Sequence, residues 1–291
     1  MKIAFTGARG YIGQAFDRMN GHLDLIPLSY SLDEETYYSN SLIGNKDLNE
    51  LLNSIEVLIH FGSFTPKNNN QVQDKISSEK NLNSTFELVK YKLPNLKHII
   101  YASTIDVYDF STIVSEKTKP NPKTEYGKSK LTCENIISQF AESRGILCSI
   151  LRIGTIYGPG TNSYQKVIPV MLTDFLSKQE ITIYDEGTIT RNFLYLDDLI
   201  KIIAEIIFST INSQVINLTG IHPTSIRELA TNIQNLAPEH TVRITELISQ
   251  KPSADHNFDL TLMNSCFPYF KYTPMNIGLM NEMNFIKSRL L

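Results

Sequence analysis

Hydrophobic residues gather in short unbroken runs along the first two thirds of the chain, and amphipathic stretches lie between these runs. Apolar runs without alternation indicate strands that are buried on both faces of a sheet. They predict strands at residues 2–6, 23–28, 57–62, 97–103, 146–154 and 215–220. The amphipathic stretches predict helices at residues 12–20, 46–54, 74–91, 126–144 and 197–210. Such an alternation of strands and helices is typical of an α/β fold with a doubly wound parallel sheet.

The regular alternation ends after Gly158. Residues 159–190 and the segment from residue 221 onward are irregular and interrupted by proline, which is typical of a smaller lobe. We therefore expect a first domain over residues 1–160, to which residues 191–220 return, and a second lobe formed mainly by residues 161–291. A chain of 291 residues is long enough for both parts to bury a core.

Composition narrows the class of partner. The chain is 42% hydrophobic and 20% charged with a net charge of −3, so it offers no basic surface for nucleic acid. No apolar stretch approaches the roughly 18 residues of a membrane span, and we expect no membrane partner and a cytoplasmic location. Its three cysteines are far apart and its six histidines lack metal-ligand spacing, so we expect no metal site. His60, inside a buried strand, is expected to be a core residue with satisfied hydrogen bonds.

Three glycines, Gly7, Gly10 and Gly13, follow the first strand and open the first helix. A loop at this position presents backbone N–H groups and the positive end of a helix dipole to an anion such as a pyrophosphate. The spacing is GxxGxxG rather than GxGxxG, and a strand-to-helix turn without any ligand has the same appearance. Both interpretations stay open on the glycines alone.

Two further features carry candidate chemistry. Tyr126 and Lys130 lie four residues apart in "TEYGKSKL", on one face of a predicted helix. A neighbouring ammonium favours the phenolate and lowers the pKa of a tyrosine, which makes it a usable acid or base. Ser103 and Thr104 end the fourth predicted strand, where ligands of such sheets bind. Separately, an exposed Tyr–Lys pair and ordinary turn residues would look the same.

In combination and in this order, these features resemble the extended short-chain dehydrogenase/reductase family of nucleotide-sugar epimerases, dehydratases and reductases. The similarity covers nearly the whole chain, since further motifs of that family are similar to "HFGS" (60–63), "NLNST" (81–85), "LRIGTIYGPG" (151–160) and "ITIYDEGTITRNFLYLDDLI" (181–200). The resemblance implies a Rossmann-type doubly wound parallel sheet with a smaller C-terminal substrate-binding lobe.

The resemblance also implies roles for single residues. Tyr126 would be the catalytic acid/base, and Lys130 would lower its pKa and bind the nicotinamide ribose. The catalytic hydroxyl lies four residues before Tyr108 and therefore falls on Thr104, with Ser103 as the alternative. The cofactor-binding residues that we expect are Gly7, Arg9, Gly10, Tyr11, Ile12, Gly13, Ser29, Asn45, Lys46, Asp47, Phe61, Gly62, Ser63, Asn81, Ser103, Tyr126, Lys130 and Ile153. The expected substrate-binding residues are Ser103, Thr104, Tyr108, Thr155 and Arg191.

Some positions depart from the family pattern. Ile105 stands where the 4,6-dehydratases of the family carry an acidic residue, and isoleucine cannot transfer a proton, which argues against a conventional dehydratase. The second strand ends in Ser29, Tyr30 and Ser31 without the carboxylate that binds the ribose of NAD. Arg9 in the glycine loop is close enough to pair with a 2′-phosphate. These positions favour NADP(H) as cofactor, with NAD as the alternative.

We therefore predict hydride transfer at C4 of a nucleotide-activated sugar. The favoured activity is that of a nucleotide-4-keto-6-deoxysugar reductase, and the alternative is a 4-epimerase that retains NAD. A hypothesis from another class is a non-catalytic NADP-binding regulatory protein, although such proteins tend to lose the catalytic tyrosine or lysine. The partner is expected to be a nucleotide-sugar, and a homodimer is possible because it is common in the family.

Overall fold

The computed structural model describes residues 1–31, 36–39, 48–68, 70–110, 113–160, 165–209, 215–238, 243–249 and 254–290. The chain divides into two compact units. The first is formed by Met1–Asp109, Lys119–Ile153 and Ile200–Asn217, and the second by Phe110–Thr118, Gly154–Leu199 and Leu218–Leu291.

The described residues of the first unit form a seven-stranded sheet with the strand order β10-β6-β5-β4-β1-β2-β3. In this order, the adjacent strands β6, β5, β4, β1 and β2 pair with one another in parallel. The edge strand β3 runs antiparallel to its neighbour β2. The strands are β1 (Lys2–Thr6), β2 (Asp24–Ser31), β3 (Thr36–Ser39), β4 (Val57–His60), β5 (His98–Thr104), β6 (Leu147–Ile153) and β10 (Val215–Leu218). This arrangement confirms the predicted α/β fold with a Rossmann-type doubly wound sheet.

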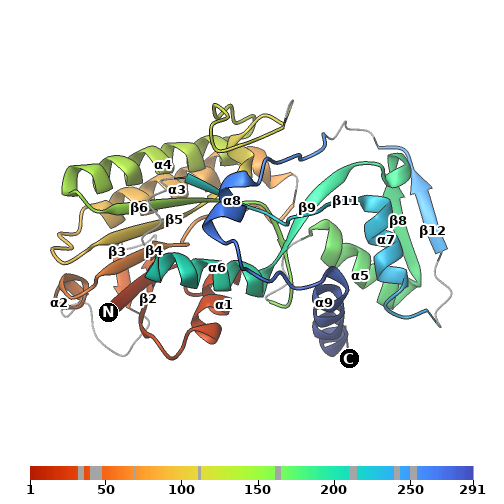
Figure 1. The fold of residues 1–291 in the computed structure, drawn as a ribbon, viewed down its shortest axis with the longest axis horizontal. Coiled ribbons are helices and arrows are strands. Elements are labelled where there is room, and N and C mark those ends of the chain that lie inside the picture. Colours follow the sequence, from red (N-terminus) through yellow and green to blue (C-terminus); the bar gives the residue numbers. More distant parts are fainter. Residues whose placement is uncertain are drawn as a thin grey trace. The chain divides into compact units, whose positions relative to one another are not determined.

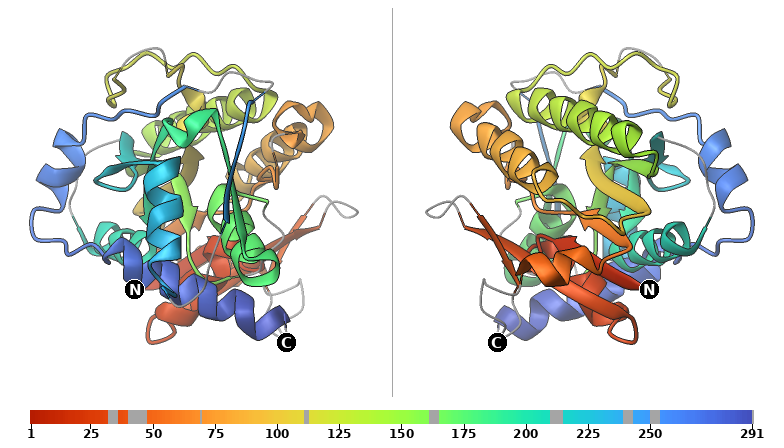
Figure 2. Two further views of the ribbon diagram at one scale, coloured as in Figure 1. Left: turned by 90° about the vertical axis from the view of Figure 1, so that its right-hand side faces the viewer. Right: turned by 90° about the vertical axis from the view of Figure 1, so that its left-hand side faces the viewer.

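Helices cover both faces of this sheet. Figures 1 and 2 show α3 and α4 on one face and α1 with α6 on the other. The central strands are buried on both sides, as their unbroken apolar runs predict: every residue of β4 and β5 is buried. The helices are α1 (Tyr11–Met19), α2 (Leu48–Asn53), α3 (Lys75–Val89), α4 (Glu125–Arg144) and α6 (Leu196–Phe208).

The second unit contains two small sheets among the described residues. One has the order β11-β9-β7 and the other pairs β12 with β8 in parallel. Its strands are β7 (Thr155–Tyr157), β8 (Glu180–Tyr184), β9 (Thr190–Tyr195), β11 (Pro223–Ser225) and β12 (Arg243–Leu247). Its helices are α5 (Val167–Lys178), α7 (Ile226–Gln234), α8 (Thr261–Cys266) and α9 (Met275–Leu290).

The strand β9 pairs with β7 and β11, and all three strands lie in the second unit. The expected domains, residues 1–160 with 191–220 and residues 161–291, stay a prediction. Within the described part of the chain, no helix is long and apolar enough to cross a membrane.

Candidate functional site

The glycine turn after β1 depends on close backbone packing. Gly7 has a φ of +73°, and a Cβ placed on it would lie 2.7 Å from the backbone nitrogen of Gly62. A Cβ on Gly13 would lie only 2.2 Å from the carbonyl oxygen of Gly7. These two glycines therefore let α1 begin directly above the turn. Gly10 is different, because it is exposed and its Cβ would find no atom nearer than 3.1 Å.

The N-terminus of α1 has the properties of an anion site. Gly10 occupies the N-cap without any side-chain hydrogen bond, and the first turn, which begins with Tyr11 and Ile12, contains no acidic residue. At a helix N-terminus the backbone N–H groups and the positive end of the helix dipole favour a bound anion. Arg9 is exposed in the same turn and adds a positive charge. The residues present here fit the pyrophosphate of a dinucleotide.

A buried polar chain holds the loop after β4 next to the glycine turn. The backbone N–H of Gly62 donates to the Thr6 hydroxyl at 2.9 Å, and that hydroxyl lies 2.6 Å from His60 Nδ1. His60 Nε2 lies 3.1 Å from the hydroxyl of Thr85 on α3. Burial, and secondarily the charge of Lys130, lowers the pKa of His60 to about 3, so the ring is neutral. His60 is a satisfied core residue, as predicted.

Asn81 on α3 holds the same loop from another side. Its Oδ1 accepts from the backbone N–H of Phe64 at 2.6 Å, and its Nδ2 donates to the Ser129 hydroxyl on α4 at 3.1 Å. Asn81 therefore connects α3, α4 and the loop that contains the predicted cofactor contacts Phe61, Gly62 and Ser63. A direct contact between Asn81 and the cofactor stays a prediction.

The start of α4 is packed tightly against the end of β5. The helix begins after Thr124, whose hydroxyl accepts from the backbone N–H of Gly127 at 3.0 Å. A Cβ on Gly127 would lie 2.3 Å from the carbonyl oxygen of Asp106, so only glycine permits this approach. The Thr104 hydroxyl accepts from the backbone N–H of Asp106 at 3.2 Å. The segments that carry Thr104 and Tyr126, each less than a tenth exposed, are thereby brought together.

Lys130 is the most constrained of the predicted catalytic residues. Its Nζ donates to the Ser63 hydroxyl at 2.9 Å and to the carbonyl oxygen of Ala102, and it lies 4.5 Å from the ring centroid of Tyr101. The side chain is buried, and desolvation lowers the pKa of Lys130 to about 8, while the negative charge of Glu134 acts in the opposite direction. The ammonium therefore sits one helical turn from Tyr126 among groups from β5, α4 and the loop after β4.

Ser103 and Tyr108, both predicted to contact substrate, turn their hydroxyls into an internal polar cluster. Ser103 donates to Glu134 of α4, and the Tyr108 hydroxyl donates to Asn217 Oδ1 at 2.9 Å. The same Tyr108 oxygen accepts from Arg152 Nη1 at 2.7 Å. A contact of these two hydroxyls with a substrate would require an exchange of hydrogen bonds, and it stays a prediction.

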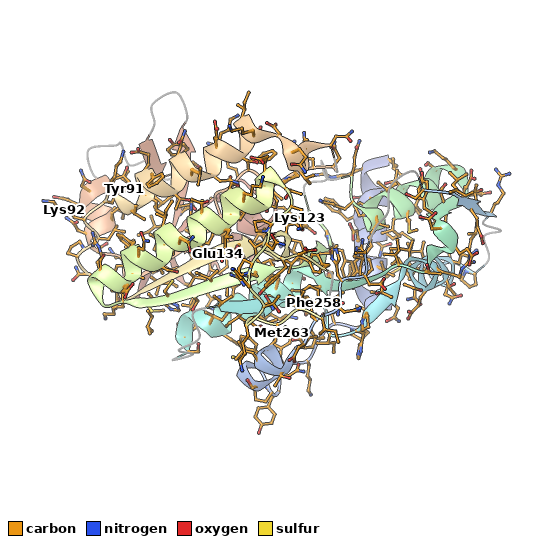
Figure 3. The ribbon with its side chains drawn as sticks, turned by 90° about the horizontal axis from the view of Figure 1, so that it is seen from above. Tyr91, Lys92, Lys123, Glu134, Phe258 and Met263 are labelled. Carbon is orange, nitrogen blue, oxygen red and sulfur yellow. The ribbon has the colours of Figure 1, made fainter. Side chains whose placement is uncertain are left out.

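Sequence reasoning missed Glu134 and Arg152. The available signal was the position of Glu134, one further turn along the helical face of Tyr126 and Lys130, and the placement of an arginine within the otherwise apolar β6. Figure 3 labels Glu134 on α4. Buried charges are normally paired, so a glutamate and an arginine at buried positions each indicate an oppositely charged partner.

The remaining predicted residues lie in separate places. Ser29 is buried in β2, and Ile153 is buried at the end of β6. In the second unit, Thr155 begins β7, and Arg191 Nη1 donates to the carbonyl oxygens of Thr190 and Ala254 at 2.7 and 2.8 Å. Partial burial lowers the pKa of Arg191, opposed by the charge of Asp255. The predicted contacts Asn45, Lys46 and Asp47 lie outside the described residues. Among the described side chains, no three or more His, Cys, Asp or Glu are grouped to hold a metal ion.

The chain is similar to known nucleotide-sugar enzymes. The model of the NAD dependent epimerase/dehydratase family matches residues 3–218. An uncharacterized UDP-glucose epimerase of Bacillus subtilis, YtcB, is 25% identical over 314 residues, which cover 99% of this chain and 98% of that protein. A dTDP-D-glucose 4,6-dehydratase of Dictyostelium discoideum is 26% identical over 69% of this chain and 54% of its own length. The UDP-glucuronic acid 4-epimerase of Bacillus cereus, solved with UDP-glucuronic acid and NAD, has the same fold, with a TM-score of 0.82 and 24% identity over 99% of this chain and 100% of that chain.

Proposed function

The chain belongs to the NAD dependent epimerase/dehydratase family, and from that premise we propose that it is a 4-epimerase of a nucleotide-activated sugar that works with NAD. The observation that carries this proposal is the enclosure of Lys130 by Ser63, Ala102 and Tyr101, one turn from Tyr126. Burying an ammonium is unfavourable unless hydrogen bonds or an opposite charge compensate for it. A phenolate of Tyr126, one helical turn away, would supply such a charge.

The proposed order of candidates differs from the one that the sequence favoured. YtcB, a UDP-glucose epimerase by name, matches over almost the full length of both chains, and the Bacillus cereus 4-epimerase of the same fold was solved with NAD. Both similarities support the 4-epimerase with NAD over the reductase with NADP(H). Ile105, which cannot act as an acid, continues to argue against a dehydratase.

The first unit carries groups that would bind the pyrophosphate and the nicotinamide ribose of the dinucleotide. The exposed N-terminus of α1 would bind the pyrophosphate through backbone N–H groups, and Gly10 keeps the approach free of a side chain. The Lys130 ammonium and the Ser63 hydroxyl would bind the nicotinamide ribose. When bound, the nicotinamide would supply the acceptor and donor of the hydride at C4.

In the first half of the reaction, the Tyr126 phenolate takes the proton of the C4 hydroxyl while the C4 hydrogen leaves as hydride. The Thr104 hydroxyl accepts from the backbone N–H of Asp106 through a lone pair, so its own proton can be donated to the C4 oxygen. Lys130 stabilises the phenolate through its positive charge. In the second half, Tyr126 returns the proton to the C4 oxygen as hydride reaches the opposite face of C4, so no external oxidant or reductant is consumed.

The first experiment identifies the nucleotide that the freshly purified protein releases on denaturation. We expect NAD in stoichiometric amount, and conversion of a UDP-hexose to its C4 epimer without added nucleotide, followed by NMR. In D₂O the product should carry no deuterium at C4, because the hydrogen returns as hydride. Tyr126→Phe should lower kcat about 10²- to 10⁴-fold, the range of a lost general acid/base. Absence of both bound NAD and epimerisation would overturn the proposal.

A second candidate is the 4-keto reductase, which two described features favour. The end of β2 carries Ser29 rather than a carboxylate, and exposed Arg9 can pair with a 2′-phosphate. This candidate predicts a protein that is purified without nucleotide and binds NADPH more tightly than NADH. The regulatory hypothesis predicts instead that Tyr126→Phe keeps the biological effect of the protein.

A further inference from the structure

A buried ionic cluster lies between α4 and the carboxyl ends of three strands. Glu134 Oε1 accepts from the Ser103 hydroxyl of β5 and from Arg152 Nε of β6 at 3.0 Å, and Oε2 accepts from Arg152 Nη2 at 2.7 Å. Arg152 Nη1 continues to the Tyr108 hydroxyl, which donates to Asn217 of β10. All five residues are at most 5% exposed. The cluster thus joins α4, β5, β6 and β10 through directional bonds.

Stability alone does not explain this cluster. Removing two charges from water is unfavourable, and well-packed hydrophobic residues often replace a buried ion pair without loss of stability. A two-pronged guanidinium–carboxylate pair does, however, hold its partners in one geometry. What the cluster provides is therefore a defined position for the segments that it joins.

Those segments carry the proposed catalytic residues. Ser103 directly precedes Thr104, and it is the β5 partner of Arg152 in the sheet register. Tyr126, Lys130 and Glu134 follow one another at four-residue intervals on α4, so they share one face of the helix. A carboxylate one turn beyond Lys130 also places a negative charge near the buried ammonium.

We propose that Glu134 is a positioning residue of the reaction: through Ser103 and Arg152 it holds the end of β5 against α4, and it places a carboxylate one helical turn from the Lys130 ammonium. This inference rests on the proposed function for its kinetic part. Its electrostatic part concerns only side chains of the first unit. Glu134 is expected to touch neither sugar nor cofactor, since its carboxylate is already bonded to Ser103 and Arg152.

The electrostatic part follows from the groups around Lys130. Desolvation by its surroundings disfavours the ammonium, and the negative charge of Glu134 favours it. Removing the charge of Glu134 leaves the desolvation in place and takes away part of the compensation. Titratable or charged groups that face this region from the packed elements are His60 of β4, Tyr101 of β5, Arg152 of β6, and Tyr126, Cys133 and Glu134 of α4.

The test compares Glu134→Gln with Ser103→Ala and Glu142→Gln in the protein as purified. Glu134→Gln removes the charge, Ser103→Ala removes only the hydrogen bond, and Glu142→Gln is the matched control because Glu142 is exposed on the same helix. The pH midpoint of Lys130 is followed through its 13Cε chemical shift in lysine-labelled protein, with Lys130→Met identifying the resonance. The pH profile of kcat and the KM for the UDP-hexose are measured in parallel.

We expect Glu134→Gln to lower the Lys130 midpoint by about one pH unit and to move the alkaline limb of kcat in the same direction. Ser103→Ala should lower kcat roughly tenfold through misplacement of Thr104, with the midpoint unchanged. Glu142→Gln should match the wild type in both. An unmoved midpoint in Glu134→Gln, or an unchanged kcat in Ser103→Ala, overturns the proposal. Ser103→Ala keeps the test decisive should Glu134→Gln not fold, because a moved midpoint there also contradicts it. If the wild type does not epimerise the UDP-hexose, the proposed function is contradicted. The 13C midpoints of Lys130 would still test the role of Glu134, because they do not depend on activity.

Discussion

Glu282 makes the stability of this protein depend on pH in a way that can be measured. The side chain projects from α9, is 2% exposed, and accepts one hydrogen bond from the backbone N–H of Gly158 at 3.0 Å. Burial raises the pKa of Glu282 from 4.5 to about 8, while the bond from Gly158 acts in the opposite direction. In the folded protein at neutral pH this carboxyl is therefore protonated, whereas in the unfolded chain it is ionised.

The sign and size of the effect follow from this difference. Between pH 4.5 and pH 8 the folded state binds more protons than the unfolded state, so the free energy of unfolding falls as the pH rises. Below pH 4.5 the contribution of Glu282 to stability is fully present, and above pH 8 it is fully lost. Since one pKa unit corresponds to about 1.4 kcal/mol, Glu282 alone lowers the free energy of unfolding by about 3 kcal/mol between pH 5 and pH 8.

Glu282→Gln keeps the size of the side chain and an oxygen that accepts from Gly158, but it cannot ionise. We expect the difference in unfolding free energy, wild type minus variant, to fall by about 3 kcal/mol from pH 5 to pH 8. Urea unfolding at four pH values measures it, followed by far-UV circular dichroism because the chain has no tryptophan. Glu228→Gln, at an exposed carboxylate of α7, is the matched control. A difference that stays constant with pH in Glu282→Gln would refute the reasoning.

Other predictions concern the first unit. Gly13→Ala should abolish nucleotide binding in calorimetric titrations and lower the free energy of unfolding by about 1–3 kcal/mol. The reason is that a Cβ at this position would lie 2.2 Å from the Gly7 carbonyl oxygen. Gly10→Ala, whose Cβ would have no contact under 3.1 Å, should lower the free energy of unfolding less. In the wild type the pKa of Lys130 is lower in the folded than in the unfolded state, so its free energy of unfolding should rise with pH, whereas Lys130→Met has no amine to titrate. From pH 7 to pH 9.5, the free energy of unfolding of the nucleotide-free wild type should rise by about 2 kcal/mol relative to that of the variant. A difference that does not change with pH in urea unfolding contradicts this. Gly127→Ala should lower kcat by about 10² or more, since a Cβ 2.3 Å from the Asp106 carbonyl oxygen forces the start of α4 away from β5, and unchanged kinetics would show that this contact is dispensable.

The sequence predicts the first unit well because its signals are local. The unbroken apolar runs match β1, β4, β5 and β6 to within a few residues, and the amphipathic stretches match α3 and α4. A strand that is buried on both faces has no alternation of polar and apolar residues, so an unbroken apolar run indicates such a strand. The short β3 at the sheet edge and the small strands of the second unit were not predicted, because three to five residues carry little periodicity.

The candidate site divides in the same way. Spacing along one segment determined the glycine turn and the shared helical face of Tyr126 and Lys130. It did not determine that Lys130 reaches Ser63, 67 residues earlier, or that Arg152 pairs with Glu134, 18 residues earlier. Those partners come from separate strands and helices, and only the folded sheet brings them within hydrogen-bond distance.

By itself, then, the order of apolar runs determined the α/β fold, and the resemblance that the glycines, the YxxxK pair and the further motifs carry implied the family and the residues that the proposed chemistry uses. The tertiary structure decided how those residues are held: which hydroxyls face inward, which glycines the backbone packing requires, and which buried charges surround Lys130. The physical reason is that periodicity reports burial within one element, whereas hydrogen bonds and desolvation depend on what other elements place beside it.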